Sequence, residues 1–315
     1  MNQITVVIAL YKPNLKWLQE ELESIERQSY REFSVIAWND SPDDAYDYDS
    51  FFKKYMPSIS FQIIKGEKNL GSNGAFEQLT KLVKTPYIAY CDQDDIWESE
   101  KLEILFQTIQ SEDATLVFSD MKVIDGNSNV IASHIREVRP RQIFYTGPDA
   151  LEHLLVKNFV TGCTMMMKTS VAKAALPFPS SVFHDWWLAV YAAANGKIAM
   201  ASKPLMKYRI YGGNQSAVLA GVFDKSSYYE KRIASQREFI QFVSDKIDRN
   251  QVVENARIWY QARCEYFKSP SISGAKNLMK QSRNNSWTTY FELVLPFMPN
   301  ILFDKIIGGV KTGHL

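Results

Sequence analysis

The chain has 315 residues, of which 46% are hydrophobic and 23% charged, the balance of a folded globular protein with one large or two modest domains. Thirty-six Lys and Arg against thirty-five Asp and Glu leave a net charge of +1, so the composition gives no reason to expect nucleic acid as a partner. The three cysteines, Cys91, Cys163 and Cys264, lack CxxC spacing and indicate reduced thiols, which excludes a disulfide framework and a zinc site.

The first residues, MNQITVVIALYKP, have neither the basic start nor the small-residue cleavage site of a signal peptide. Uninterrupted apolar runs stay shorter than the ~18 residues of a membrane-spanning helix. We therefore expect a cytoplasmic protein, one end of which is a candidate for contact with the inner face of the cell membrane.

Strand and helix patterns alternate through the first part of the chain. Ile4–Leu10 is a short β-branched run typical of a strand buried on both faces, and the helix that follows places Leu18 and Leu22 on one face behind an N-cap at Asn14. Such alternation predicts an α/β fold with a mostly parallel sheet flanked by helices. The other predicted strands are 33–38, 61–64, 87–91 and 115–119, and the other helices lie near 75–82 and after an N-cap at Ser99.

Beyond about Val222 the pattern is helical only, and the charge changes with it. Residues 225–315 contain fourteen Lys and Arg and eight Asp and Glu, a net charge of +6, which leaves −5 for residues 1–224. We therefore predict an acidic α/β catalytic domain at 1–222 and a basic helical region at 223–315.

The stretch YCDQDDIW follows a predicted strand and contains three carboxylates. Asp92 and Asp94, two residues apart, have the spacing at which both can face one hard cation, and Mg²⁺ or Mn²⁺ favours such sparse sites. The alternative is that Asp94 and Asp95 only stabilise the start of a helix through its dipole.

Asp40, in WNDSPDD, also follows a strand, so it should share one sheet edge with Asp92. A carboxylate there can accept a hydrogen bond from N3–H of uracil or thymine. The alternative is an ordinary turn aspartate before Ser-Pro.

The stretch NLGSNGAF offers Asn69, Ser72 and Asn73 beside two glycines, which suits close approach of a nucleotide but matches no known phosphate-loop signature. A plain loop entering a helix explains it equally well.

In FHDWWLAVYAA, Asp185 stands before two tryptophans at a predicted helix start. Aromatic walls raise the pKa of a carboxyl group and stack on sugars, so Asp185 is a candidate general base. The alternative is an N-cap with two core tryptophans.

In KYRIYGGNQSA, Arg209 lies on a predicted Gly-rich loop, where it would stabilise a departing phosphate group. An ordinary solvated Lys207 and Arg209 pair is the alternative.

The ordered motifs VVIALYKP, WNDSPDD, NLGSNGAF, YCDQDDIW, TGCTMMM, HDWW and YRIYGGN resemble family 2 inverting glycosyltransferases of the GT-A fold. Within that family they most resemble bacterial rhamnosyltransferase-like enzymes of surface polysaccharide synthesis. The resemblance covers residues 1–220 and implies a Rossmann-like GT-A domain, followed here by a helical extension.

Residue by residue, the resemblance implies that Asp92 and Asp94 are the DxD motif that contacts the ribose and the divalent metal. Asp40 matches the carboxylate that contacts the base, and Ala9 and Tyr11 match the segment lining the nucleoside pocket. The implied partners are a dTDP- or UDP-sugar donor and a saccharide or lipid-linked acceptor.

Asp185 matches the general base of the family, which implies transfer with inversion. The chain departs from the family at Tyr211, where related sequences often have histidine as an extra metal or diphosphate contact. That departure implies that binding of the metal or of the diphosphate relies more on Asp94 and Arg209.

The segment Ser286–Lys311 is rich in apolar and aromatic residues but is interrupted by Pro296 and Pro299. One interpretation is an interfacial segment that brings a basic tail to an anionic membrane. The other is packing on the catalytic domain or a contact between copies of the chain.

Two other classes of function compete. A sugar nucleotidyltransferase also uses paired aspartates and Mg²⁺, but it normally has a Gly- and Arg/Lys-rich loop after the first strand, where this chain reads ALYKPNLKW. A non-catalytic carbohydrate-binding module on the same fold would have no need of Asp92, Asp94 and Asp185 together.

Overall fold

The computed structural model describes residues 2–211, 219, 221–247, 250–281 and 286–311. The chain forms two compact units: an N-terminal unit of Met1–Ala150 with Phe159–Tyr211, and a C-terminal unit of Leu151–Asn158 with Gly212–Leu315. The pattern-based boundary at 222 therefore lies eleven residues beyond Tyr211, where contacts end the N-terminal unit, and no sequence pattern indicated that residues 151–158 belong with the helical part.

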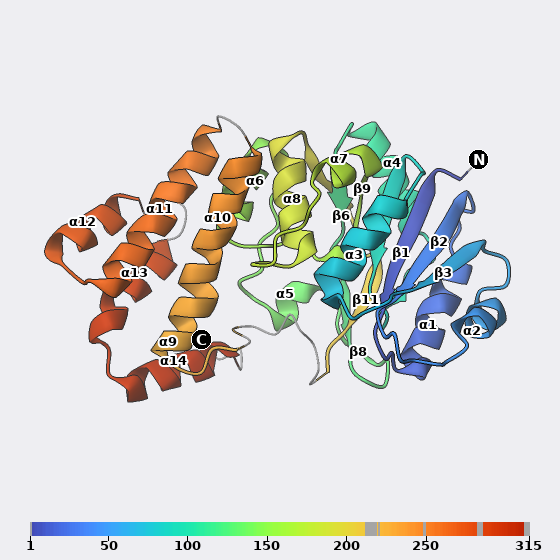
Figure 1. The fold of residues 1–315 in the computed structure, drawn as a ribbon, viewed down its shortest axis with the longest axis horizontal. Helices are drawn as coiled ribbons and strands as arrows, with labels where there is room; N and C mark the ends of the chain where they lie inside the picture. Colours follow the sequence, from blue (N-terminus) through green and yellow to red (C-terminus); the bar gives the residue numbers. More distant parts are fainter. Residues whose placement is uncertain (1, 212–218, 220, 248–249, 282–285, 312–315) are drawn as a thin grey trace. The chain divides into compact units, whose positions relative to one another are not determined.

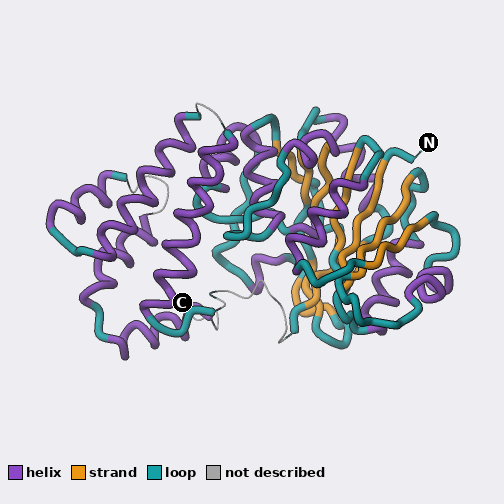
Figure 2. The backbone as a smooth tube through the Cα atoms, viewed as in Figure 1, coloured by secondary structure: helices purple, strands orange, loops and turns teal. Residues whose placement is uncertain are grey.

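The N-terminal unit is built on a seven-stranded sheet with the order β10-β6-β9-β4-β1-β2-β3 (Figures 1 and 2). Strand β9 runs antiparallel to its neighbours β4 and β6, and the other pairs are parallel. This arrangement confirms the predicted α/β class with a mostly parallel sheet. The strands are β1 (Ile4–Leu10), β2 (Phe33–Asn39), β3 (Phe61–Lys65), β4 (Tyr87–Cys91), β6 (Leu116–Phe118), β9 (Met165–Lys168) and β10 (Ile198–Met200).

A second, four-stranded sheet has the order β5-β11-β7-β8. Met206 pairs with Trp97 in the antiparallel contact of β11 and β5, so the last strand of the unit lies directly beside the residues that follow the three aspartates. The strands are β5 (Ile96–Trp97), β7 (Lys122–Ile124), β8 (Val130–Ala132) and β11 (Met206–Arg209).

Helices cover both faces of the large sheet. Alternate residues of β1, among them Ile4 and Ile8, belong to one core cluster with Leu18 and Leu22 of α1, whereas α3 packs on the same strand from the other face (Figure 1). Burial on both faces explains why β1 is apolar throughout. The helices of this unit are α1 (Leu15–Glu26), α2 (Tyr48–Tyr55), α3 (Gly71–Leu82), α4 (Lys101–Ser111), α5 (Ile135–Val138), η1 (Gly147–Asp149), α6 (Ala150–Leu154, shared with the other unit), η2 (Gly162–Thr164), α7 (Thr169–Ala174) and α8 (His184–Ala194).

One of the two predicted helix caps is confirmed and the other is wrong. The side chain of Asn14 accepts hydrogen bonds from the N–H groups of Lys16 and Trp17, as expected of an N-cap. Helix α4 starts at Lys101, so Glu100 and not Ser99 occupies the cap position, without a side-chain cap hydrogen bond. The Ser99 carbonyl instead accepts a hydrogen bond from Ser29 N–H, and this contact holds Ser99 outside the helix.

The C-terminal unit is helical in its described residues, in agreement with the pattern beyond Val222. Among the residues described, no helix combines the length and the apolar character needed to cross a membrane. The helices are α9 (Lys225–Tyr228), the π-helical turn η3 (Tyr229–Ala234), α10 (Ser235–Lys246), α11 (Gln251–Lys268), α12 (Ile272–Lys280), α13 (Ser286–Val294), η5 (Leu295–Phe297) and α14 (Asn300–Lys311).

A buried ion pair ties the helices of this unit together. Arg263 on α11 donates to both carboxylate oxygens of Glu292 on α13, at 2.7 and 2.5 Å, and also to Gln236 at 3.0 Å. The hydroxyl of Tyr228 donates to the same carboxylate at 3.0 Å. Because the pair is almost fully buried, loss of one partner would leave the other charge without solvent or counter-charge.

We predict that Arg263→Ala lowers the free energy of unfolding by about 3–5 kcal/mol, since it strands the Glu292 carboxylate in the core. The matched control is Arg257→Ala on the same helix, because Arg257 pairs with Glu254 at the surface. That change should cost less than about 1 kcal/mol. Urea unfolding followed by circular dichroism measures both. Equal losses in the two variants would contradict the role assigned to the buried pair.

Candidate active site

Three strand ends meet at one edge of the large sheet. In the parallel ladders Ile8 pairs with Cys91 and Leu10 pairs with Asn39, so β1, β4 and β2 end side by side. The residues that follow, Tyr11, Asp92 and Asp40, therefore leave the sheet at the same edge, as expected from the sequence.

A glutamine joins the first two of these loops. Tyr11 N–H donates to Gln93 Oε1 at 2.8 Å, and Gln93 Nε2 donates to the Tyr11 carbonyl at 3.1 Å. This double contact holds the loop after β1 against the loop of the three aspartates, while the Tyr11 ring remains exposed and Ala9 is half-buried. No sequence pattern assigned a role to Gln93.

Asp95 is buried, and Asp92 and Asp94 are half-buried, so the loop is largely shielded from water. Burial, together with the charges of Asp94 and Asp185, raises the pKa of Asp92 to about 7. Burial also raises the pKa of Asp94, opposed by the hydroxyl of Tyr211, which donates to Asp94 Oδ2 at 2.7 Å. Both Asp94 and Asp95 precede strand β5 and not a helix, so the explanation by a helix dipole does not apply.

Two buried ionisable residues, Glu21 and Lys101, support this acidic loop from the protein interior. Glu21 of α1 accepts from Asp95 N–H at 3.0 Å, and burial raises the pKa of Glu21 to about 8, opposed by Lys101. The ammonium of Lys101 donates to the Cys163 carbonyl at 2.5 Å and lies 3.6 Å from the centre of the Trp97 ring. Below pH 8 Glu21 is therefore neutral and adds no further negative charge under the aspartates.

The sequence did carry a signal for Glu21. It stands three residues after Leu18, one before Leu22 and four before Ile25, on the buried stripe of α1. A charged residue within an apolar stripe has a buried partner more often than not, and this one was overlooked.

Arg209 is placed differently from the prediction. It is the last residue of strand β11, not part of a loop, and its side chain is completely buried. Its guanidinium donates to the Asp94 carbonyl at 2.7 Å and to Glu20 at 2.6 Å, and its backbone N–H donates to Asp95 at 2.9 Å. The side chain thus holds the acidic loop from within instead of facing a diphosphate. Gly212–Ala217, the glycine-rich continuation, lies outside the described residues.

Asp40 fixes the start of helix α3. Its carboxylate accepts from Leu70 N–H at 2.9 Å, Gly71 N–H at 2.8 Å and the Trp38 indole at 3.2 Å. Gly71 has a φ of +68°, a conformation that favours glycine. The expected contact of Asp40 with a base stays a prediction, and any such contact shares the carboxylate with these three donors.

Asn73 connects α3 to the start of α8. Its amide donates to the carbonyls of Pro179 and Val182, at 2.9 and 2.6 Å, and its oxygen accepts from His184 N–H at 2.8 Å. We infer that Asn73 positions the segment that carries Asp185, a role absent from the sequence prediction. Asn69, by contrast, is exposed, and Ser72 is half-buried at the first turn of α3.

Asp185 lies in the first turn of α8, where Phe183 is the cap residue. One carboxylate oxygen accepts from Gly162 N–H at 3.1 Å and the other from Trp186 N–H at 2.6 Å. Trp187 is buried and donates to the Ala175 carbonyl, so it belongs to the core and not to a sugar-binding wall. The alternative in which Asp185 is the N-cap is therefore wrong. The alternative of two core tryptophans is correct for Trp187 but not for Trp186, which is half-buried.

His184 is a buried neutral imidazole. Burial lowers its pKa to about 3, and its ring lies 4.2 Å from the ring of Phe76. Among the described residues neither ring nitrogen has a hydrogen-bond partner. A neutral ring enclosed by aromatic groups fits a packing role beside Asp185, and not that of a base.

The short helix η2 joins Asp185 to the acidic loop. Gly162 donates to Asp185, and the next residue, Cys163, accepts from Lys101 beneath the aspartates. A Cβ at position 162 would come within 3.1 Å of His184 Nε2, which explains glycine there. The base candidate and the acidic loop are therefore linked through η2, and the charge of Asp185 is one of the causes that raise the pKa of Asp92.

Two aspartates of this loop, together with Cys163 of η2, form a group that could hold a divalent cation. Asp92, Asp95 and Cys163 each offer one ligand atom, and these atoms lie within 4.8 Å of one another, while Asp94 lies beside them in the loop. The carboxylates repel each other, and a cation would relieve that repulsion. Their hard oxygens suit Mg²⁺ or Mn²⁺, with Asp92 and Asp94 as the ligands expected from the sequence.

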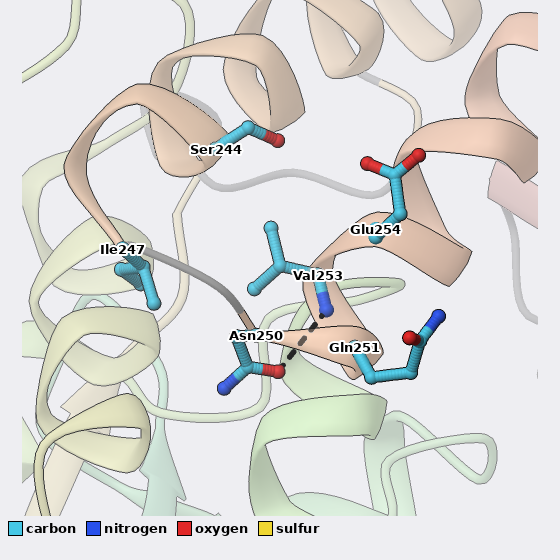
Figure 3. A pocket seen from close by; sticks show the side chains of 6 residues that line it. All are labelled: Ser244, Ile247, Asn250, Gln251, Val253 and Glu254. Atoms are coloured by element: carbon cyan, nitrogen blue, oxygen red, sulfur yellow. Dashed lines mark hydrogen bonds between the residues drawn. The ribbon is translucent and has the colours of Figure 1, made fainter.

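A separate pocket lies in the C-terminal unit, at the turn between α10 and α11 (Figure 3). Its volume is about 300 Å³, and its one carboxylate, Glu254, pairs with Arg257. The side chain of Asn250 that points into it caps α11 through Val253 N–H. With no other titratable group in its lining, this pocket is not the candidate active site.

Comparison with known proteins agrees with this geometry. The model of glycosyl transferase family 2 matches residues 5–174, more than half of the chain, so the protein belongs to that family. The processive diacylglycerol beta-glycosyltransferase of Mycoplasma pneumoniae is 29% identical across 99% of this chain and 94% of its own length. The dTDP-rhamnosyl transferase RfbG of Shigella flexneri is 24% identical across 67% of this chain and 74% of its own.

Solved structures show the same fold. S. aureus TarS, residues 1–349, in complex with UDP-GlcNAc superposes with a TM-score of 0.61 and 15% identity, covering 99% of this chain and 91% of that one. The fold is thus of the GT-A type expected from the motifs, and the protein is a glycosyltransferase.

We predict that Glu21→Gln flattens the pH dependence of stability. In the wild type the pKa of Glu21 is about 8 in the folded state and near its ordinary 4.5 when unfolded, so the stabilisation by its proton is complete below pH 4.5 and is lost as pH rises through 8. Glutamine does not titrate, so the Glu21→Gln variant does not lose this stabilisation as the pH rises. At pH 9 it should be the more stable by ~2 kcal/mol or more, with little difference at pH 4.5.

Urea unfolding between pH 4.5 and 9, in the presence of a chelator, measures this difference. Glu23→Gln on the same helix is the matched control, because Glu23 pairs with Arg27 near the surface. Parallel profiles for the wild type and Glu21→Gln would show that Glu21 does not hold its proton in the folded state.

Proposed function

We propose that the protein is an inverting glycosyltransferase of surface polysaccharide synthesis, with Asp185 as its general base. It would move a sugar from a dTDP- or UDP-sugar to a hydroxyl group of a saccharide or lipid-linked acceptor. The observation that carries the proposal is that Asp185 accepts a hydrogen bond from Gly162, while the next residue, Cys163, offers a ligand atom within 4.8 Å of those of Asp92 and Asp95, so a proton acceptor lies beside a cluster of cation ligands.

The relatives support the donor and acceptor classes. By their names, one acts on diacylglycerol and another transfers a rhamnosyl group from a dTDP-sugar, while TarS binds UDP-GlcNAc. Rhamnose is the sugar suggested by the motifs, and the dTDP-rhamnosyl relative supports it. The alignment with the diacylglycerol enzyme includes the helical C-terminal region, which supports a lipid or lipid-linked acceptor.

The proposed reaction is one displacement. The acceptor hydroxyl oxygen attacks the anomeric carbon and its proton passes to a carboxylate oxygen of Asp185. The bond from that carbon to the diphosphate oxygen breaks, with its electron pair staying on the nucleoside diphosphate. Attack opposite the leaving group inverts the configuration.

Within this site, Gly162 and Asn73 would keep Asp185 in place, through the hydrogen bond to its carboxylate and through the start of α8. A cation held by Asp92 and Asp94 would neutralise charge on the departing diphosphate. The nucleoside and ribose would contact the ends of β1 and β2 and the start of α3. These segments contain Ala9, Tyr11, Asp40, Asn69 and Ser72.

We expect Asp185→Asn to lower the rate of sugar transfer by a factor of at least about 10², because asparagine cannot accept the proton. Affinity for the nucleoside diphosphate should stay within about twofold, since the amide preserves shape and acceptor oxygen. Release of nucleoside diphosphate from a panel of sugar nucleotides, followed by mass spectrometry, gives the rate, and calorimetry gives the affinity. Full activity of this variant would refute the assignment of Asp185.

Asp94→Asn should act on the cation instead. We expect Mn²⁺-dependent binding of UDP or dTDP to weaken about tenfold or more, with little change in binding measured without metal. Mn²⁺ bound to the protein, measured by electron paramagnetic resonance, provides a readout that needs no turnover. Unchanged Mn²⁺ binding would remove Asp94 from the cation site.

Release of pyrophosphate from a nucleoside triphosphate would favour the nucleotidyltransferase alternative.

A further inference from the structure

The C-terminal unit exposes a regular row of apolar side chains. Trp287 and Tyr290 on α13, Val294 at its end, Phe297 in η5 and Ile301 on α14 follow each other three or four residues apart and are exposed, Trp287 by 86% and Ile301 by 74%. We call these five residues the apolar row.

The apolar row is not the face that holds the unit together. The opposite side of the same helices supplies Leu295, Phe303 and Ile307 to the core, and Glu292 to the buried pair with Arg263. The fold is therefore complete without the row. Five large apolar side chains left exposed between Trp287 and Ile301 exceed the singly scattered apolar residues of an ordinary surface, which favours an external partner.

The shape of the segment restricts that partner. Pro296 and Pro299 separate α13 from α14, and neither helix has the length to cross a bilayer. Short helices with one apolar face lie along the plane of a membrane surface. Tryptophan and tyrosine, the first two members of the row, are the residues that favour the boundary between lipid and water.

Charge decides between a membrane and a second copy of the chain. Among the described side chains of α12 to α14, Lys276, Lys280 and Lys305 are exposed against one exposed acid, Asp304. A symmetric dimer through this face would gather the surplus of lysines from both copies in one interface, with only Asp304 of each copy to offset it, and the like charges would oppose association. Anionic lipid headgroups would neutralise them, at about 1 kcal/mol for each lysine near the surface.

We propose that the apolar row docks the C-terminal unit onto the surface of an anionic phospholipid bilayer, with Lys276, Lys280 and Lys305 contacting the headgroups. Exposed Ile272 and Met279 on α12 would extend the same contact. This docking is independent of the proposed transfer reaction, because it requires neither donor nor cation. It would bring the enzyme to the surface at which a lipid-linked acceptor lies.

Sedimentation of the full chain with vesicles tests the proposal. The wild type should bind vesicles of phosphatidylcholine with phosphatidylglycerol, and bind phosphatidylcholine alone at least about tenfold more weakly. The variant Trp287→Ser/Phe297→Ser/Ile301→Ser should lose at least about tenfold in binding to the anionic vesicles.

The matched control removes three exposed apolar residues of the N-terminal unit instead, as Val130→Ser/Ile131→Ser/Ile143→Ser. It should bind as the wild type does. Lys276→Glu/Lys280→Glu/Lys305→Glu should lower binding to the anionic vesicles only. That variant keeps the proposal testable if the apolar-row variant fails to fold by circular dichroism.

Three results would overturn the docking. The first is a wild type that sediments with neither vesicle, and the second is binding that the apolar-row variant retains. The third is a wild-type dimer in light scattering that this variant breaks, which would make a second copy the occupant. Nucleoside diphosphate release with a soluble acceptor, measured on the same variants, separates failure of docking from failure of the proposed transfer.

Discussion

The site depends on how three aspartates are kept together in a place with little water. Like charges in such surroundings repel strongly, and the structure counters the repulsion from within the protein. The buried guanidinium of Arg209 holds the backbone of Asp94, Lys101 places its charge beneath the loop, and burial keeps Glu21 protonated near neutral pH. Burial, together with the charges of Asp94 and Asp185, still raises the pKa of Asp92.

The same support reaches the candidate base. Lys101 donates a hydrogen bond to the Cys163 carbonyl, and the preceding residue, Gly162, donates to Asp185. The short helix η2 therefore connects the acidic loop to the candidate base. Asn73 fixes the other side of Asp185 by holding the start of α8. Because each of these contacts is with backbone, the positions of base and acidic loop follow from the fold and depend little on side-chain motion.

Local patterns in the sequence were a good guide where neighbours in the chain decide the outcome. The apolar run of β1, the cap at Asn14 and the aspartates placed after β2 and β4 follow from nearby residues and from the common direction of parallel strands. The loop placement of Arg209 was wrong, and the contacts of Asn73 were not predicted, because their partners are remote in the chain: Glu20 for Arg209, and Pro179 for Asn73. No local pattern contains such partners.

The sequence by itself therefore determined the α/β class, the family motifs and the sheet edge at which the acidic residues gather, since periodicity and strand direction are properties of short segments. Only the tertiary structure decided which polar groups are satisfied by the protein and which remain for chemistry. It buried Arg209, set Asn73 against the start of α8, and linked Asp185 to η2 beside the acidic loop. Burial and hydrogen-bond partners depend on segments that meet only when the chain is folded.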